Sequence, residues 1–76
     1  MHYTYILKLG GDKFYIGYTN NLERRTLEHQ KTWDCKLVYY EAYSTELLAR
    51  NRERKLKYYG SAWRGLKQRL EAKRAG

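Results

Sequence analysis

The stretch YIGYTNNLERRTLEH, residues 15 to 29, passes from an aromatic, strand-like run through Gly17 into a run rich in arginine with helical character. Asn20 and Asn21 are both residues that favour the N-cap of a helix. The stretch therefore predicts a β-strand that leads into a helix over residues 21 to 31. A fold that contains it must combine strands and helices.

Strand-like sequence also lies on either side of this stretch. Residues 3 to 9 (YTYILKL) and 13 to 17 (KFYIG) flank a Gly-Gly-Asp turn, which is typical of a β-hairpin. Residues 36 to 43 (KLVYYEAY) have the same aromatic and β-branched chemistry and predict a third strand.

The last part of the chain predicts two helices. Ser44 or Thr45 can cap a helix over residues 46 to 58, and Gly60 is placed to end it. Ser61 is then expected to cap a final helix, one face of which carries Trp63, Leu66 and Leu70. The predicted order is ββαβαα, an α+β fold with a three-stranded mixed or antiparallel sheet flanked by helices, in a single domain of residues 1 to 76.

The formal net charge of +8 is concentrated at one end of the 76-residue chain. Residues 1 to 49 hold six Lys/Arg and six Asp/Glu, whereas residues 50 to 76 hold ten Lys/Arg and two Glu. A basic surface of this kind attracts polyanions, because each neutralised phosphate releases counterions. We expect nucleic acid as the partner, in preference to a merely solvated helical surface.

The cysteine count and the hydropathy indicate the compartment. Cys35 is the single cysteine, so no internal disulfide can form and no zinc-type cluster is expected. The sequence shows no signal-peptide pattern and no apolar run of about 18 residues. We therefore expect a cytoplasmic protein that does not bind a membrane.

The predicted helix at residues 21 to 31 changes character along one face. Leu22, Arg25 and His29 fall at i, i+3 and i+7, so the face begins apolar and continues with a guanidinium and an imidazole. Arg25 can clamp a phosphate and His29 can exchange a proton near neutral pH. In the alternative interpretation, which the helix alone favours, Arg25 pairs with Glu28 or Glu41 and His29 is a boundary histidine.

Glu53 is the only acid within a basic helical run. A structural reason for it is an i to i+4 ion pair with Lys57. A functional reason is that its carboxylate is a ligand for a divalent cation that binds together with phosphates. The spacing does not decide between the two.

Tyr5 and Tyr15 occupy corresponding places in the two hairpin strands and are expected to share a face. Gly17 would let the backbone or a ligand approach closely at the strand end. Packing is the expected role of five further tyrosines and both tryptophans, although an exposed ring can stack on an unpaired base. These side chains are Trp33, Tyr39, Tyr40, Tyr43, Tyr58, Tyr59 and Trp63.

Taken together, these residues resemble a GIY-YIG nuclease domain. Tyr15-Ile16-Gly17 is the literal second half of that signature, and Tyr3-Thr4-Tyr5 stands where Gly-Ile-Tyr is usual. Arg25 and His29 resemble the arginine and histidine of the helix that follows. The run RERKLK, residues 52 to 57, looks like the glutamate-bearing segment of small single-domain members. The resemblance covers essentially the whole chain.

This resemblance implies a divalent-metal-dependent DNA endonuclease with little sequence specificity, suited to DNA repair or to branched or single-stranded DNA. Glu53 would hold Mg²⁺ or Mn²⁺, Arg25 would clamp the scissile phosphate, and Tyr5, Tyr15 or His29 would position or deprotonate the attacking water. Gly17 and a basic face would contact the nucleic acid. The residues of that face are Arg50, Arg54, Lys57, Arg64 and Lys67.

Three alternatives remain open at this point. The degenerate first half of the signature is compatible with a non-catalytic nucleic-acid-binding module. Charge and tyrosines do not distinguish DNA from RNA. A protein partner that supplies the substrate is the third alternative, with the region of Trp33 and Cys35 as its contact surface.

Overall fold

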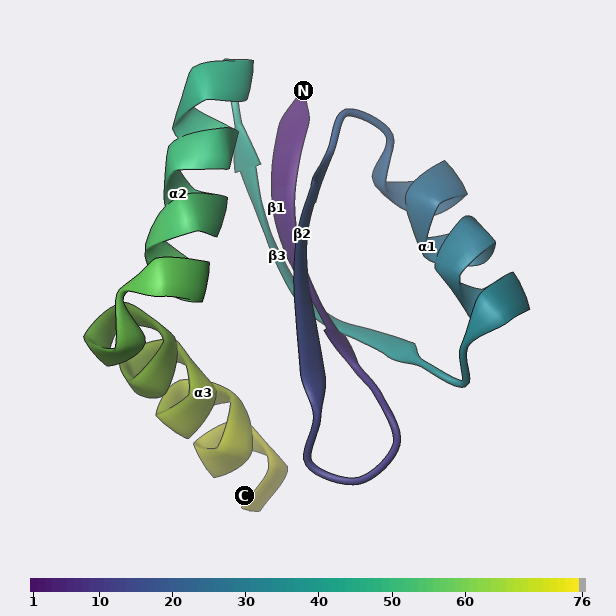
Figure 1. Cartoon of the computed structure of the whole chain (residues 1–76), viewed down its shortest axis with the longest axis vertical. Coiled ribbons are helices and arrows are strands. Elements are labelled where there is room, and N and C mark those ends of the chain that lie inside the picture. Colours follow the sequence, from purple (N-terminus) through teal and green to yellow (C-terminus); the bar gives the residue numbers. More distant parts are fainter. Residues whose placement is uncertain (76) are drawn as a thin grey trace.

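The elements follow one another in the predicted order ββαβαα (Figure 1). The computed structural model describes the backbone of residues 1 to 75 and the side chains of residues 1 to 71. The strands are β1 (His2–Lys8), β2 (Phe14–Thr19) and β3 (Lys36–Tyr43), and the helices are α1 (Leu22–Thr32), α2 (Glu46–Tyr58) and α3 (Gly60–Ala75).

The three strands form one antiparallel sheet in the order β2-β1-β3. The predicted α+β class is confirmed, and of the two sheet types expected, the antiparallel one is present. In the centre of the sheet Tyr5 lies opposite Gly17 on β2 and opposite Tyr40 on β3. The β1–β3 register shifts between Ile6 and Leu7, which marks a β-bulge. Because β1 lies between the other two strands, β2 forms one edge of the sheet.

Helices cover both faces of the sheet, with α1 on one face and α2 and α3 on the other (Figure 1). Successive side chains of a strand point to opposite faces, so neighbouring residues of β1 serve different layers. The Tyr5 hydroxyl meets His29 of α1, whereas the Thr4 hydroxyl donates a hydrogen bond of 2.6 Å to the carbonyl of Ala49 in α2. β1 thus connects the two helical layers.

The hydrophobic core lies between the sheet and the pair α2 and α3. Its centre is formed by Ile6, Leu56 and Leu66, all buried. Among the described residues, seven partly buried side chains pack around this centre, and the ring of one of them, Phe14, meets Trp63 edge to face at a centroid distance of 5.3 Å. A small hydrophobic core is expected for a chain of 76 residues, because short chains bury a smaller fraction of their surface.

The N-terminal ends of α1 and α2 agree with the sequence, whereas the break between α2 and α3 differs. Asn21 and Thr45 are the N-caps, with side chains that accept the backbone N–H of Arg24 and Leu48. The helix break expected at Gly60 instead falls at Tyr59, which is extended.

The prediction that Ser61 caps the last helix is wrong, because α3 begins at Gly60. The Tyr59 carbonyl accepts the N–H groups of Ala62 and Trp63, so Tyr59 already holds the start of α3.

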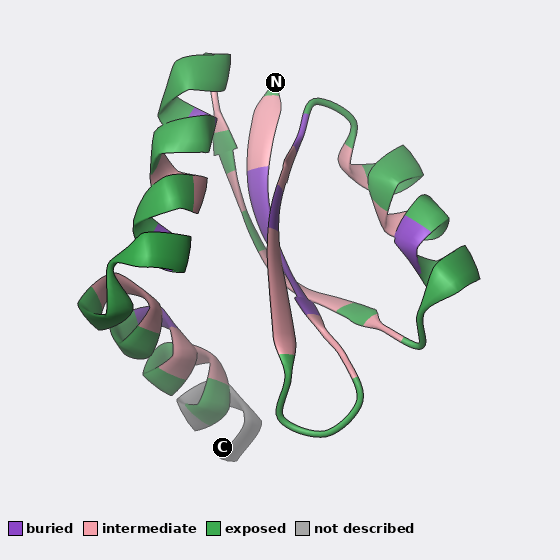
Figure 2. Ribbon diagram, in the orientation of Figure 1, coloured by how far each residue is buried: buried purple, intermediate pink, exposed green. Residues whose placement is uncertain are grey.

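Three tyrosines that were expected to pack are exposed. Tyr40 lies on β3, and Tyr58 and Tyr59 lie at the junction of α2 and α3. Figure 2 shows this junction as exposed. In the described part of the chain, no helix has the length and apolar character needed to cross a membrane.

Candidate active site

A hydrogen bond between Tyr5 and His29 forms the centre of the candidate site. The Tyr5 hydroxyl lies 2.9 Å from Nε2 of His29, which joins the central strand to α1. Both residues are buried, with 1% of Tyr5 and 8% of His29 exposed. A phenol and an imidazole in contact away from water form a pair that can transfer a proton.

Tyr15 and Trp33 complete an aromatic cluster around this pair. The ring of Tyr15 lies 4.9 Å from that of His29 and 5.5 Å from that of Trp33, centroid to centroid. Trp33 stacks on His29 at 5.1 Å with the two planes 14° apart. We call Tyr5, Tyr15, His29 and Trp33 the aromatic cluster. Trp33 had been expected only to pack or to contact a partner, although its position four residues after His29 was a signal for this contact.

Gly17 makes room for the ring of Tyr5. A Cβ atom at position 17 would lie 2.5 Å from both Cζ and the hydroxyl oxygen of Tyr5, and 2.9 Å from Cε1 of Tyr15. The close approach predicted at Gly17 is therefore made by Tyr5 of the neighbouring strand. The glycine is buried, and its direct contribution to the site is the position of that phenol.

Arg25 lies at the solvent side of the aromatic cluster. Interaction with the Tyr5 hydroxyl and an ion pair of 3.2 Å with Glu28 raise the pKa of its guanidinium. The ion pair with Glu28 is one of the two pairings that the sequence offered. The other acid considered, Glu41, binds Arg52 instead. Arg25 is exposed, so the weak surface pair with Glu28 leaves it able to bind an anion.

The protein environment shifts the pKa values of Tyr5 and His29 in opposite directions. Burial raises the pKa of Tyr5 to about 12, although Arg25 acts in the opposite direction. Burial also lowers the pKa of His29, and the positive charge of Arg25 lowers it further. At neutral pH the phenol therefore keeps its proton and the imidazole is neutral. In the tautomer that carries its proton on Nδ1, Nε2 of His29 accepts a hydrogen bond from the Tyr5 hydroxyl.

Glu53 lies on α2, on the opposite side of the sheet from α1 (Figure 1). Its carboxylate forms an ion pair of 3.1 Å with Nζ of Lys57, as the structural interpretation of the sequence expected. Among the described residues, no group of three or more His, Cys, Asp or Glu side chains could hold a metal ion. Any ion bound at Glu53 would therefore have at most two such ligands from the described residues.

The predicted basic face divides into paired and unpaired residues. Arg50 forms an ion pair of 2.8 Å with Glu46 and lies over the ring of Tyr18, 4.7 Å from its centroid. Lys57 is bound to Glu53 as described above. No ion pair within the described residues involves the remaining three, which are Arg54, Arg64 and Lys67.

A second polar cluster, which the sequence did not indicate, connects β3 to α2. The Glu41 carboxylate accepts hydrogen bonds from the hydroxyls of Tyr39 and Tyr43 and from the guanidinium of Arg52. Burial alone would raise the pKa of Glu41, but these donors outweigh it and hold the pKa below its usual value. All four side chains are partly buried, so this cluster fixes α2 on the sheet.

Comparison with known proteins identifies the family. The chain is 34% identical to a UPF0213 protein of Natronomonas pharaonis over 84 residues, which cover 99% of this chain and 95% of that protein. The chain belongs to the UPF0213 family. It is also similar to UPF0213 proteins of Haloquadratum walsbyi, with 34% identity over 67 residues and 76% of the chain, and of Clostridium perfringens, with 37% identity over 62 residues and 70% of the chain. No family model and no solved structure matches it.

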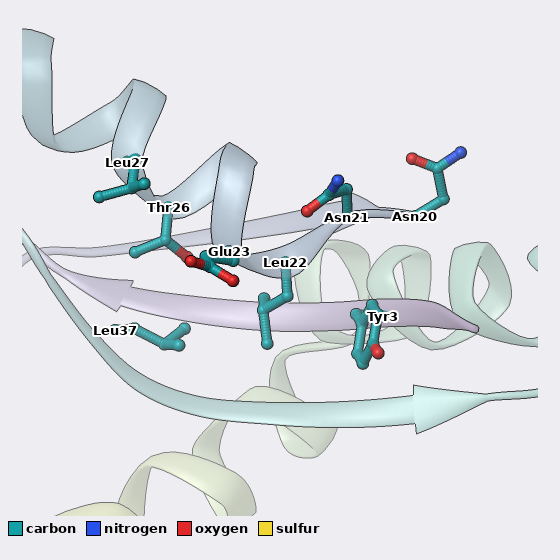
Figure 3. Close-up of a pocket in the computed structure, with 8 residues that line it drawn as sticks. All are labelled: Tyr3, Asn20, Asn21, Leu22, Glu23, Thr26, Leu27 and Leu37. Carbon is teal, nitrogen blue, oxygen red and sulfur yellow. The ribbon is translucent and has the colours of Figure 1, made fainter.

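A pocket of this UPF0213 protein lies under the first part of α1 (Figure 3). Its volume is about 570 Å³, and Tyr3, Leu22 and Leu37 contribute to its apolar lining. Figure 3 shows Leu22 pointing from α1 toward the sheet. No member of the aromatic cluster lines the pocket, nor does Arg25. The pocket is therefore separate from the candidate active site.

Proposed function

We propose that this UPF0213 protein is a divalent-metal-dependent endonuclease of the GIY-YIG type that hydrolyses phosphodiester bonds in DNA with little sequence specificity. The observation that carries the proposal is the Tyr5–His29 hydrogen bond within the aromatic cluster. It brings together tyrosines from both halves of the signature-like sequence and the histidine of α1, with Arg25 beside them. A role in DNA repair and a cytoplasmic location belong to the same proposal.

Arg25 supplies the phosphate clamp in this proposal. Its guanidinium stays protonated at every physiological pH, and its interaction with Tyr5 places it beside the aromatic cluster. Glu28 is an exposed partner, so a phosphate with more negative charge can replace it. Charge that develops on phosphorus oxygens in the transition state would then face a preorganised cation.

Proton removal from the attacking water is assigned to the Tyr5–His29 pair acting together. To ionise a phenol with a pKa of about 12 at pH 7 costs about 7 kcal/mol, so free tyrosinate is a poor base here. A neutral imidazole accepts a proton readily at this pH. Tyr5 would pass its own proton to Nε2 of His29 while it takes one from water, and the phenol would remain neutral throughout.

In this proposal the substrate approaches the aromatic cluster from the side of Tyr15 and Arg25. Tyr5 and His29 are buried, whereas Tyr15 is half-buried and Arg25 is exposed. The scissile phosphate would therefore contact Arg25 and the Tyr15 hydroxyl, and the water would lie between that phosphate and Tyr5. Trp33, stacked on His29, keeps the imidazole in one orientation.

Glu53 fits a metal ion that arrives with its substrate. Mg²⁺ commonly binds through one or two carboxylates, several waters and substrate phosphates, so a single glutamate suits it once Lys57 is released. When bound, the ion would act as a Lewis acid that stabilises charge on the phosphate and on the leaving 3′ oxygen. An ion that needs several protein ligands does not fit this residue, and Mn²⁺ is expected to behave as Mg²⁺ does.

The edge strand β2 lies between the two parts of the proposed site. α1 lies on one side of the sheet and α2 on the other, with β2 at the edge that both border (Figure 1). Arg50 lies over Tyr18 of β2, and Glu53 follows Arg50 by three residues and so shares that side of α2. A DNA strand that crosses the β2 edge would meet Arg25 on one side and Glu53 on the other.

A cleavage assay with matched controls tests the proposal. Plasmid, single-stranded and branched DNA would be incubated with Mg²⁺ or with EDTA, using the wild-type protein and the variants Arg25→Ala and Glu53→Ala. Arg24→Ala, a neighbouring exposed arginine, and Glu71→Ala, an exposed glutamate of α3, are the controls. We expect metal-dependent cleavage that falls at least about 100-fold in the two test variants and less than twofold in the controls. Unchanged cleavage by Glu53→Ala would remove the metal ligand from the proposal.

A second candidate function is a nucleic-acid-binding module without turnover. The ion pair between Glu53 and Lys57 favours it, because the proposed metal ligand already has a cation as its partner. DNA binding without cleavage under every metal condition would support the module. Cleavage of RNA in preference to DNA would instead assign an RNA-directed nuclease.

A further inference from the structure

Two adjacent tyrosines are the most exposed aromatic residues of this protein. Tyr58 is 77% exposed and Tyr59 is 61% exposed, at the elbow where α2 meets α3. Figure 2 shows the elbow on the outside of the molecule, away from the sheet. Two neighbouring rings in water remain without a packing role, so a ligand that stacks on aromatic faces would gain contact area there.

The backbone that carries these rings is held in place. The Tyr59 N–H donates to the carbonyl of Lys55 at 2.9 Å, and the Tyr59 carbonyl accepts from the N–H groups of Ala62 at 3.0 Å and Trp63 at 3.4 Å. Trp63 in turn packs against Phe14. The elbow is therefore preorganised, and a ligand would have to order only the two side chains.

The charge around the elbow matches a nucleic acid backbone. Arg54 and Lys55 precede Tyr58 by four and three residues, which places them on its side of α2, and Arg64 follows at the start of α3. Between Glu53 and Glu71 the sequence contains no acidic residue. Cations beside exposed rings are the combination with which proteins bind single-stranded nucleic acids.

We propose that Tyr58 and Tyr59 stack on unpaired bases of single-stranded DNA while Arg54, Lys55 and Arg64 bind the flanking phosphates. Stacking needs a free base face, so paired bases within a duplex are not accepted. This inference rests on the proposed nuclease function for its choice of DNA, and it names the substrate class, which is DNA that contains a single-stranded stretch. Tyr58 lies five residues after Glu53, about 7.5 Å further along α2, so the elbow is on the same helix as the proposed metal ligand.

Binding measured in EDTA tests this inference without any need for cleavage. Fluorescence anisotropy would give the affinity for an end-labelled oligothymidylate, for a duplex of equal length and for the matching RNA. The variants are Tyr58→Leu/Tyr59→Leu, which keeps bulk and removes both rings, and Tyr58→Phe/Tyr59→Phe, which keeps the rings. Tyr40→Leu, an exposed tyrosine of β3, is the control. Circular dichroism would show that each variant is folded.

We expect the leucine double variant to bind single-stranded DNA about tenfold or more weakly, with less than twofold loss for the duplex. The phenylalanine double variant and the control should stay within twofold of the wild type. Wild-type binding by the leucine variant, or an equal loss for the duplex, would overturn the proposal, and tighter binding of RNA would overturn the choice of DNA. If binding depends on the two rings but no DNA is cleaved, only the nuclease proposal is contradicted. If DNA is cleaved but binding does not depend on the rings, only this inference is contradicted.

Discussion

The ring of Tyr5 fills the space that any side chain at position 17 would need. The two residues lie opposite each other on β1 and β2, and a Cβ atom at position 17 would come within 2.5 Å of the phenol. Such a distance is shorter than real carbon contacts allow. The glycine of the YIG sequence is therefore matched to the tyrosine of the other strand.

Gly17→Ala should destabilise the protein by about 1–3 kcal/mol, because the new methyl group must displace the buried Tyr5 ring. Urea denaturation measures the free energy of unfolding. Gly10→Ala is the control, because nothing lies within 4 Å of a Cβ at that position. Equal stability of the two variants would show that Tyr5 moves aside at no cost.

Tyr5→Phe should make the protein less sensitive to alkaline pH. Burial holds the pKa of Tyr5 at about 12 in the folded protein, above its ordinary value of 10, so stability is complete below pH 10 and falls as the pH rises toward 12. Two pKa units correspond to about 3 kcal/mol. Tyr43 has the same raised pKa of about 12 and contributes a similar loss. Urea midpoints at pH 8 and pH 11 should therefore differ less in the variant, and an unchanged difference would contradict the shift.

Glu41→Gln should lower stability at pH 7 by about 1–3 kcal/mol, because a charged acceptor of three donors is lost. The folded pKa of Glu41 lies below its ordinary value, so its contribution is present above that ordinary value and is lost as the pH falls through the folded pKa. Denaturation midpoints between pH 7 and pH 3 should fall less steeply in the variant. Glu28→Gln, which removes only an exposed pair with Arg25, should change stability by less than about 0.5 kcal/mol.

The pH dependence of DNA cleavage should report the lowered pKa of His29. A neutral imidazole is needed to accept the proton, so the rate should rise with pH to a plateau, with a midpoint below the ordinary pKa of 6.5. In His29→Gln, the amide oxygen can still accept from Tyr5 but cannot titrate. We expect the rate to fall at least about 100-fold and the acidic limb to disappear, and persistence of that limb in the variant would exclude His29 as the proton acceptor.

Local sequence patterns were sufficient to predict the elements and the shared face of Tyr5 and Tyr15, whereas the grouping of His29 with them came from the resemblance. Alternating aromatic and β-branched residues indicated all three strands, and Asn21 and Thr45 were both among the expected caps. Tyr5 and Tyr15 share a face because strand side chains alternate, and a helix that follows Gly17 brings His29 over that face. Each of these relationships spans few residues or follows from strand periodicity.

Local patterns could not predict features that depend on the strand register or on which face of the sheet a helix covers. Glu41 binds Arg52 because β3 lies under α2 at one particular offset, which no local pattern specifies. The exposure of Tyr58 depends on the angle between α2 and α3, and that angle follows from Tyr59 rather than from the neighbouring Gly60. The side of the sheet on which Glu53 lies is likewise a property of the complete fold.

The hydrogen bond from Thr4 to the Ala49 carbonyl has a consequence for the kinetics of folding. It links residues 45 positions apart, whereas the hairpin partner of Tyr5 is Gly17. An isolated two-stranded hairpin is at best marginally stable in water, so early closure of β1 on β2 brings little gain. The central strand becomes stable only when residues 36 to 49 dock against it, and closing a loop of that length is the slower event. The folding rate should therefore respond to substitutions in β3 and early α2 more than to changes in the Gly10-Gly11 turn.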